Sequence, residues 1–370
     1  MKIPVEYDEV LNRIGSINPI RYAKNRNYID GAVTCLSPYI SRGVISVKQV
    51  MQDVLKRGYN PVQIEKFLQE LAWREYFQRV WQKKGSLIWH DLKQPQADVL
   101  HHEMITAIEN GKTGIDAIDS QIIKLFETGY MHNHIRMYVA SIACNIGKAH
   151  WLSPSRWMYY HLLDGDIASN TCSWQWIAGT FSLKKYYCNQ DNINKYTYSI
   201  QKQTFLDNEY TVVPVMKIPG ILTQTNPLQL QTFLPKTALP DLKPEWPTLL
   251  YNSYNIDPEW RKNDKLNRVL LLEPSHFEKY PVSPAVIDFV VRLSGNIQGI
   301  QLYCGEVDDL VKQYAENGSE ADSAFISKEH PAFTYYPGIK DTREWMYPEV
   351  TGYHPSFFSY WKKCERYLKK

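Results

Sequence analysis

Several features that identify common protein classes are missing from this chain of 370 residues. No run of 18 apolar residues occurs, and the first ten residues, MKIPVEYDEV, lack the apolar core of a signal peptide. The six cysteines form no CxxC pair, which argues against a zinc or disulfide framework. Internal repeats and low-complexity segments are missing too. The sequence therefore predicts a cytoplasmic protein with reduced thiols, no metal site and no membrane segment.

The chain also lacks a large excess of positive or negative charge. The formal net charge is only +3, which by itself is weak evidence for nucleic-acid binding. Aromatic residues, in contrast, are abundant, with 26 Tyr and 11 Trp. They suit stacking on a flat ligand, and they equally suit a well-packed core. The length of the chain favours two domains.

The first 210 residues are predicted to form a helical domain. Residues 1–44 have no clear period and are rich in turn signals. Apolar residues then recur at helical spacing, and Pro61 suits the start of one long helix. The predicted helices are Ser46–Arg57, Pro61–Lys84, His102–Glu109, Ile115–Glu127 and segments near 130–146, 154–163 and 167–179.

The rest of the chain is predicted to be different. Residues 211–250 are rich in proline and suit an extended surface linker. Strand-like and helix-like segments alternate in residues 251–370, which indicates a small parallel α/β domain of unknown role. Its segments are the strands Arg268–Leu272, Gly299–Tyr303 and Ala324–Ser327 and the helices Ser283–Leu293, Glu306–Glu316 and Ser356–Leu368. The predicted fold is therefore mainly α, with this small α/β domain following the linker.

One stretch, Gly129–Asn192, holds more polar groups than a helical core normally accepts. Those polar residues are Asn133, His134, Arg136, Asp164, Asp166 and Asn170. Asp166 stands where it can cap a helix or accept a hydrogen bond from a ligand. Asn170 and Trp174 follow at four-residue intervals, so the three side chains form a row on one face of the predicted helix. Buried polar groups need partners. The row suits a pocket for a large polar ligand, and it also suits a capped helix with a satisfied polar network.

Two upstream segments add candidates for ligand binding. Thr34 and Ser37 place hydroxyls in a turn that can hold phosphate, although a plain turn explains them equally well. Glu70, Trp73 and Arg74 fall on nearly one side of their helix. Arg74 can clamp a phosphate and Glu70 can accept from a ring N–H. A surface ion pair beside a core tryptophan is the alternative.

Taken together, these segments resemble the FAD-binding helical domain of the cryptochrome/DNA photolyase family. The motifs that carry the resemblance are TCLSPYISRGVIS, ELAWREYF, GKTGIDAID, TGYMHNHIRM and LLDGDIASNTCSWQW, in the family's order. The resemblance covers roughly residues 20–200 and implies FAD bound in a folded, U-shaped conformation. It also implies that the cofactor is bound by Tyr22, Thr34, Ser37, Arg74, Asn133, Arg136, Asp164, Asp166 and Asn170.

The resemblance assigns particular roles to some of these residues. Arg136 would pair with Asp164 near the flavin ring, and Asn170 would face flavin N5, where a carboxamide can donate or accept. Trp174 and Trp151 match the inner two members of the family's electron-transfer chain. The third position holds Asp98, which leaves Trp89, Trp157 or a tyrosine as possible substitutes.

For a photolyase, the substrate would be a cyclobutane pyrimidine dimer flipped out of damaged DNA. The resemblance places Glu70, Trp73, Asn133, Met137 and Trp176 at this lesion as catalytic residues. The excited reduced flavin would donate one electron, the cyclobutane ring would split, and the electron would return. The expected activity is that of a deoxyribodipyrimidine photolyase-like lyase, with blue light as its energy source.

The sequence also departs from the family pattern. The antenna-binding α/β domain that normally precedes the FAD domain is missing, so the chain is expected to be an atypical short member. His134 and Asn189 replace basic residues expected at the DNA entrance, which weakens the partnership with DNA. The alternative is a cryptochrome-like blue-light photoreceptor without repair activity, or a flavin-binding scaffold. The pair His132 and His134 lacks the further ligands that a zinc site needs.

Overall fold

The computed structural model describes residues 3–316 and 324–368, and its contacts divide the chain into two compact units. The helical unit comprises Asn18–Val33 and Gln63–Leu230. The sheet unit comprises Thr34–Val62, the described residues of 231–370 and those before Asn18. No described helix is both long and apolar enough to cross a membrane. All six cysteines carry free thiols.

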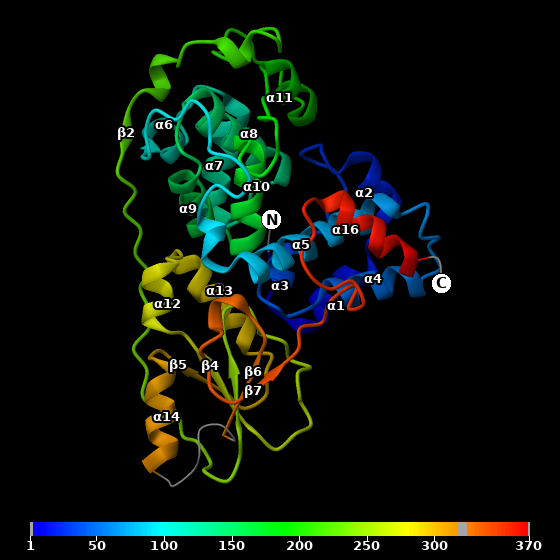
Figure 1. Cartoon of the computed structure of the whole chain (residues 1–370), viewed down its shortest axis with the longest axis vertical. Helices are drawn as coiled ribbons and strands as arrows, with labels where there is room; N and C mark the ends of the chain where they lie inside the picture. The colour runs from blue at the N-terminus through cyan, green and yellow to red at the C-terminus, as the bar shows by residue number, and fades with distance from the viewer. Residues whose placement is uncertain (1–2, 317–323, 369–370) are drawn as a thin grey trace. The chain divides into compact units, whose positions relative to one another are not determined.

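The helical unit is mostly helical (Figure 1), and residues between Met104 and Leu222 form its apolar core. Three of its helices, α8, α9 and α10, come from the polar stretch singled out above. Its helices are α2 (Pro19–Asn25), α5 (Glu65–Lys84), α6 (Thr106–Glu109), α7 (Asp116–Thr128), α8 (Asn133–Ser141), α9 (Leu152–His161), α10 (Ile167–Ala178) and α11 (Gln190–Thr197). Short turns of other types are η1 (Gly85–Trp89), the π-helical η2 (Ile142–Ile146), η3 (Val213–Val215) and η4 (Gly220–Leu222).

Some details of this unit differ from the prediction. The segment His102–Glu109 is not one helix, because β1 (Met104–Ile105) pairs antiparallel with β2 (Thr225–Asn226) before α6 begins. Pro61 does not start α5, which begins at Glu65 after a turn. Residues 1–44 are not irregular, since they contain α1 (Tyr7–Gly15), α2 and α3 (Ser37–Ser41). Proline in the first turn of α2 and of α3 made these short helices look like turns.

A glycine turn fixes how α7, α8 and the polar turn before α10 meet. Gly129 ends α7 with a φ of +66°, a conformation that favours glycine. A Cβ on this residue would lie 2.4 Å from Cγ of Leu163. The Leu163 amide also donates to the Gly129 carbonyl at 2.9 Å. This close approach brings the start of α8 near Asp164.

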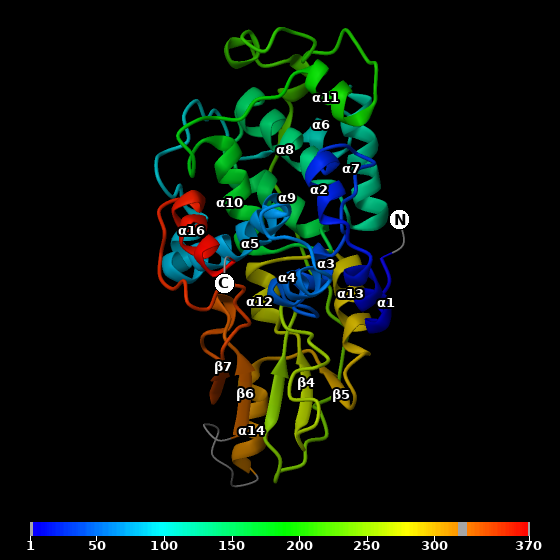
Figure 2. The same ribbon diagram turned by 90° about the vertical axis from the view of Figure 1, so that its right-hand side faces the viewer.

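The described residues of the sheet unit form five parallel strands in the order β5-β4-β3-β6-β7, which Figure 2 shows side by side. The prediction of a parallel α/β layer is therefore confirmed. The strands are β3 (Thr248–Tyr251), β4 (Asn267–Leu271), β5 (Ile300–Tyr303), β6 (Phe325–Lys328) and β7 (Ile339–Asp341). Its helices are α1 (Tyr7–Gly15), α3 (Ser37–Ser41), α4 (Val47–Lys56), α12 (Pro274–Lys279), α13 (Pro284–Ser294), α14 (Val307–Glu316) and α16 (Phe357–Cys364), with the 3-10 turns η5 (Pro331–Phe333) and η6 (Glu365–Tyr367).

The central strand of this sheet was missed by the sequence prediction. β3 falls largely inside the proline-rich residues 211–250, yet it pairs with β4 on one side and β6 on the other. All four of its side chains are buried, as in a strand covered on both faces. The prediction that residues 211–250 form only a linker is therefore wrong at its end.

The N-terminal segments also group differently from the predicted domain boundaries. The sheet unit includes Thr34–Val62, which the sequence placed with the helical domain. Packing explains the difference, because the Tyr39 ring contacts the Phe289 ring of α13 at 6.2 Å. Arg42 is buried and donates through Nη1 to the Ser253 carbonyl at 3.3 Å. Contacts between residues so far apart in the chain leave no local sequence pattern.

Candidate functional site

An ion pair joins α8 to the turn that precedes α10. Nη2 of Arg136 lies 3.0 and 2.9 Å from the two carboxylate oxygens of Asp164, and its Nε donates to the Met131 carbonyl at 2.8 Å. Asp164 is buried, whereas Arg136 is partly exposed. A buried carboxylate needs a counter-charge. This is the pair that the resemblance implied, and its position beside a flavin stays a prediction.

Asp166 is the second acidic centre and connects α10 to α5. As the N-cap of α10, its Oδ1 accepts from the Ser169 amide at 2.6 Å. Its Oδ2 accepts from Nε2 of Gln78 at 2.5 Å and lies 3.4 Å from Nη2 of Arg74. Sequence reasoning missed Gln78. The available signal was its place four residues after Arg74, on the same face of α5.

Asn170 stands at the partly exposed side of α10. Its Nδ2 donates to the Ser155 carbonyl of α9 at 2.9 Å, so its Oδ1 is the atom that can accept from a ligand. The hydroxyl of the preceding residue, the Ser169 Oγ, is buried and has no hydrogen-bond partner among the described residues. An unpaired buried hydroxyl is unusual in a native protein and is readily satisfied by a polar ligand.

Tryptophans occupy two different environments around α10. Trp174 lies in the apolar core together with Trp151 and Trp157. Trp176, two residues further, is 38% exposed and its ring lies 6.0 Å from that of Tyr186. One helix therefore presents an indole to the core and another to the surface.

The remaining predicted lesion contacts reach the surface of the helical unit. Asn133 is exposed and its Nδ2 lies 4.0 Å from the Met137 sulfur, one turn along α8. Trp73 is partly exposed and packs against Tyr76 and Phe77 of its own helix. Asn133 and Met137 thus share a face of α8, while Trp73 lies on α5.

Glu70 and Tyr22 lie near the start of α5. Glu70 is 3.4 Å from Nε of Arg26 and 3.0 Å from Nζ of Lys66, which matches the surface ion pair considered as an alternative. Tyr22 packs edge-on against Phe67, with ring centroids 5.2 Å apart. Burial raises the pKa of Tyr22 above its ordinary value, so its phenol is a neutral donor at pH 7.

Thr34 and Ser37 belong to the sheet unit, whereas the other predicted cofactor residues belong to the helical unit. Thr34 Oγ1 accepts from the Leu36 amide at 3.3 Å, and Ser37 is the first residue of α3. Both side chains are partly exposed. Their role at a phosphate stays a prediction.

The two histidines before and on α8 are hydrogen-bonded within the helical unit. His132 caps α8, and its Nδ1 accepts from the His134 amide at 3.2 Å. His134 Nδ1 lies 2.9 Å from the Asn27 carbonyl oxygen. Burial lowers the pKa of both, that of His132 to about 4, so both are neutral at pH 7. Within residues 3–316 and 324–368, no group of three His, Cys, Asp or Glu side chains is arranged to hold a metal.

Comparison with known proteins identifies the helical unit. Residues 67–209 match the family model of the FAD binding domain of DNA photolyase. Deoxyribodipyrimidine photo-lyase of Streptomyces griseus is 31% identical over 155 residues, which cover 40% of this chain and 32% of that protein. Cryptochrome-1 of Sinapis alba is 31% identical over 189 residues, which cover 47% of this chain and 37% of that protein.

A solved structure, the cryptochrome of Synechocystis sp. PCC6803, is also similar, at 25% identity and a TM-score of 0.46 over 51% of this chain and 43% of that one. The chain spans about a third of the length of the curated relatives it matches. The matched residues contain α7 to α11, the ion pair of Arg136 with Asp164 and the capping residue Asp166. The helical unit therefore carries, in residues 67–209, an FAD-binding domain similar to that of the cryptochrome/DNA photolyase family.

Proposed function

We propose that this chain is an FAD-dependent, light-driven DNA repair protein that splits cyclobutane pyrimidine dimers, as a deoxyribodipyrimidine photolyase does. The observation that carries the proposal is the pair of indoles on α10. Trp176 is 38% exposed and offers a flat surface to a substrate, while Trp174 is 2% exposed and lies in the tryptophan-containing core. Electron transfer needs an inner aromatic group and substrate binding needs an outer one.

The polar residues of the helical unit fit FAD. The Arg74 and Arg136 guanidinium groups suit the negative charge of the diphosphate and of a reduced flavin ring. Asn170 Oδ1 suits a ring N–H, and the unpaired Ser169 Oγ suits a polar edge of the cofactor. Tyr22, Asn133, Asp164 and Asp166 complete this set within the helical unit. When bound, FAD supplies light-driven transfer of single electrons.

The acidic residues keep these cations in place. Asp164 holds Arg136 by two contacts at 2.9 and 3.0 Å, and Asp166 lies 3.4 Å from Arg74. Each guanidinium is tied to a buried carboxylate and so loses little entropy when a ligand arrives. The chain's part in the reaction is thus to present fixed charges to the cofactor.

On the substrate side, Trp73 and Trp176 would form the apolar walls for two flipped pyrimidines. Glu70 would accept from a thymine N–H. Its present partners, Arg26 and Lys66, are at the surface, where an ion pair contributes about 0–1 kcal/mol. Replacing these ion pairs of Glu70 by a hydrogen bond from a thymine N–H would therefore cost little free energy. Asn133 and Met137 would contact the lesion from α8.

The decisive test mixes FAD-loaded, chemically reduced protein with an oligonucleotide that contains a thymine dimer. Blue light should restore the absorbance band of the separated thymines. Trp176→Ala should abolish this recovery, whereas Phe358→Ala, which removes an exposed ring of the sheet unit, should leave it unchanged. Wild-type protein that holds reduced FAD and still gives no recovery would refute repair.

A second candidate function is a blue-light photoreceptor without repair activity. It is favoured by the entrance residues, since His134 is buried and neutral and the Asn189 side chain caps α11. Lys185 bonds to Asp98 at 3.1 Å and is less available to phosphate. A light-dependent change in oligomer size without dimer repair would support this function. Tight, salt-sensitive binding to damaged DNA would argue against it.

A further inference from the structure

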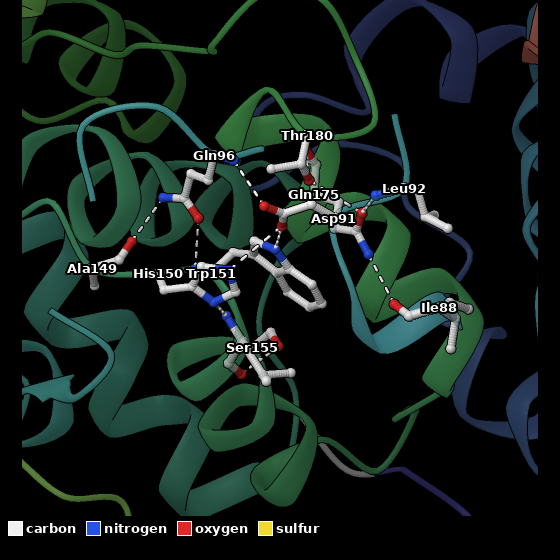
Figure 3. Close-up of polar contacts among 11 residues, drawn as sticks. Ile88, Asp91, Leu92, Gln96, Ala149, His150, Trp151, Ser155, Gln175 and Thr180 are labelled. Carbon is white, nitrogen blue, oxygen red and sulfur yellow. Dashed lines mark hydrogen bonds and ion pairs between the residues drawn. The ribbon is translucent and has the colours of Figure 1, made fainter. Parts of the chain in front are cut away.

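The fully buried indole of Trp151 has one polar partner, a carboxylate. Its Nε1–H donates to Oδ1 of Asp91 at 2.7 Å (Figure 3). Asp91 lies in the loop after η1, and Trp151 lies directly before α9. Hydrogen bonds to an ionised acceptor are shorter and stronger than neutral ones. Sequence reasoning did not single out Asp91.

Asp91 is placed as a proton acceptor. Its Oδ2 accepts from the Gln96 amide at 2.8 Å, and its Oδ1 also lies 3.5 Å from Nε2 of His150. It donates no hydrogen bond to any of the residues that the structure describes, as expected of an ionised carboxylate. Its side chain is 22% exposed, which gives the carboxylate access to water that Trp151 itself lacks.

The groups around this pair are fixed and carry no positive charge. Gln96 accepts from the Trp151 amide and donates to the Ala149 carbonyl, both at 2.9 Å. His150 Nδ1 accepts from the Leu152 amide at 3.3 Å, which assigns the ring proton to the Nε2 that faces Asp91. Burial lowers the pKa of His150, so its imidazole is neutral at pH 7.

No aromatic ring continues outward from Trp151. Among the described residues, its one ring contact is with His150, at 5.5 Å between centroids. The position where the family resemblance expects a third tryptophan holds Asp98, which is exposed and bonded to Lys185. Trp174 and Trp151 share the same apolar core, whereas no indole or phenol ring among the described residues is in contact with Trp151 on its outward side. Left as a cation in the apolar core, the oxidised indole would be costly.

We propose that Asp91 is the proton acceptor that stabilises oxidised Trp151 during photoreduction. With FAD bound, Trp174 would lose one electron to the light-excited oxidised flavin, and Trp151 would then give one electron to the oxidised Trp174. The Nε1–H bond of Trp151 breaks and the proton bonds to Oδ1 of Asp91. The products are a neutral indolyl radical and a neutral carboxylic acid, so the buried positive charge disappears. Return of the electron then requires return of the proton, which slows recombination. This inference rests on the FAD binding and electron transfer of the proposed function and does not depend on dimer repair.

Transient absorption after a blue flash on the FAD-loaded protein tests the proposal, because neutral and cationic indole radicals have different absorption bands. Wild-type protein should show the neutral radical, and deuterated water should slow its formation. Asp91→Asn keeps an acceptor for the indole N–H but is not a base, so the radical should stay in its cationic form. The electron should then return to this cation roughly tenfold faster than to the neutral radical of the wild type. Asp91→Glu should restore the neutral radical. The matched control is Asp98→Asn, which should behave as wild type.

The outcomes separate this proposal from the proposed function. A cationic radical in wild-type protein, or identical spectra and lifetimes for Asp91→Asn and Asp98→Asn, would overturn the role of Asp91 even if the flavin bleaches normally. Loss of bleaching in wild-type protein would overturn the whole photoreduction path. Dimer splitting by chemically reduced protein does not depend on Trp151, so its failure refutes repair and leaves the test of Asp91 unaffected.

Discussion

Replacing Arg136 by methionine should destabilise the helical unit more than replacing its partner Asp164 by asparagine. Arg136→Met leaves the Asp164 carboxylate, whose side chain is 4% exposed, without its counter-charge. Breaking a buried ion pair in this way costs about 3–5 kcal/mol. The lower end, about 3 kcal/mol, applies here because the Arg136 side chain is 21% exposed and admits some water.

Asp164→Asn should be milder for two reasons. Asparagine keeps an oxygen that accepts from Nη2, and the remaining guanidinium can turn towards solvent. The expected cost is about 1–2 kcal/mol, close to that of a weakened hydrogen bond to a charged group. The order of the two effects therefore follows from which partner is buried.

Urea unfolding of the FAD-free protein, followed by circular dichroism, measures these free energies through the shift in midpoint. Arg292→Met is the matched control, because Arg292 pairs with Asp288 at the surface with 54% of its side chain exposed. Its effect should stay within about 0.5 kcal/mol. If Arg136→Met costs no more than Asp164→Asn, or no more than the control, the carboxylate is not held by Arg136 and the reasoning is refuted.

Three further predictions concern pH, a turn and photoreduction. The pKa of His132 is lowered to about 4 by burial, so His132 should contribute about 2 kcal/mol to the loss of stability between pH 7 and pH 5, beside the other buried histidines. In urea unfolding, His132→Gln should make the loss about 2 kcal/mol smaller, whereas His90→Gln should not change it; equal losses in the two variants would contradict this role of His132. Gly129→Ala should lower the free energy of unfolding by about 1–3 kcal/mol more than Gly58→Ala. Both glycines have a positive φ, but only at Gly129 would the new Cβ clash with Leu163, so equal losses would contradict the role of this turn. Trp174→Phe should slow flavin bleaching under blue light at least roughly tenfold while Trp260→Phe does not, and an unchanged rate would exclude Trp174 from the electron path.

The long periodic segments of the fold were predictable from sequence. The helices at 65–84, 116–128 and 167–178 repeat apolar residues at helical spacing over three turns or more, and such patterns need no knowledge of distant contacts. β3 was not predictable in this way, because a four-residue apolar run between prolines has no period. Only its pairing with β4 and β6 makes it a strand.

In the candidate site, too, residues with a local sequence signal could be predicted, and residues defined by distant contacts could not. Asp166 was recognised because its place before a helix is a local signal, and the structure shows it as the N-cap of α10. Gln78 and Asp91 were missed because glutamine and aspartate are ordinary surface residues. Their partners stand 88 and 60 positions away along the chain, at Asp166 and Trp151. Such contacts become visible only when the fold is known.

The distribution of the sheet unit along the chain affects the order in which the protein can fold during synthesis. Thr34–Val62 emerge early, but their unit gains its strands only after Gln231, when the matched helical segment has already been made. At ordinary rates of translation this delay is roughly 10–30 s. During that time the apolar faces of α3 and α4 have no completed core to enter, whereas Gln63–Leu230 emerge without interruption. The nascent chain should therefore finish its flavin domain first and depend on chaperones to protect its earlier helices.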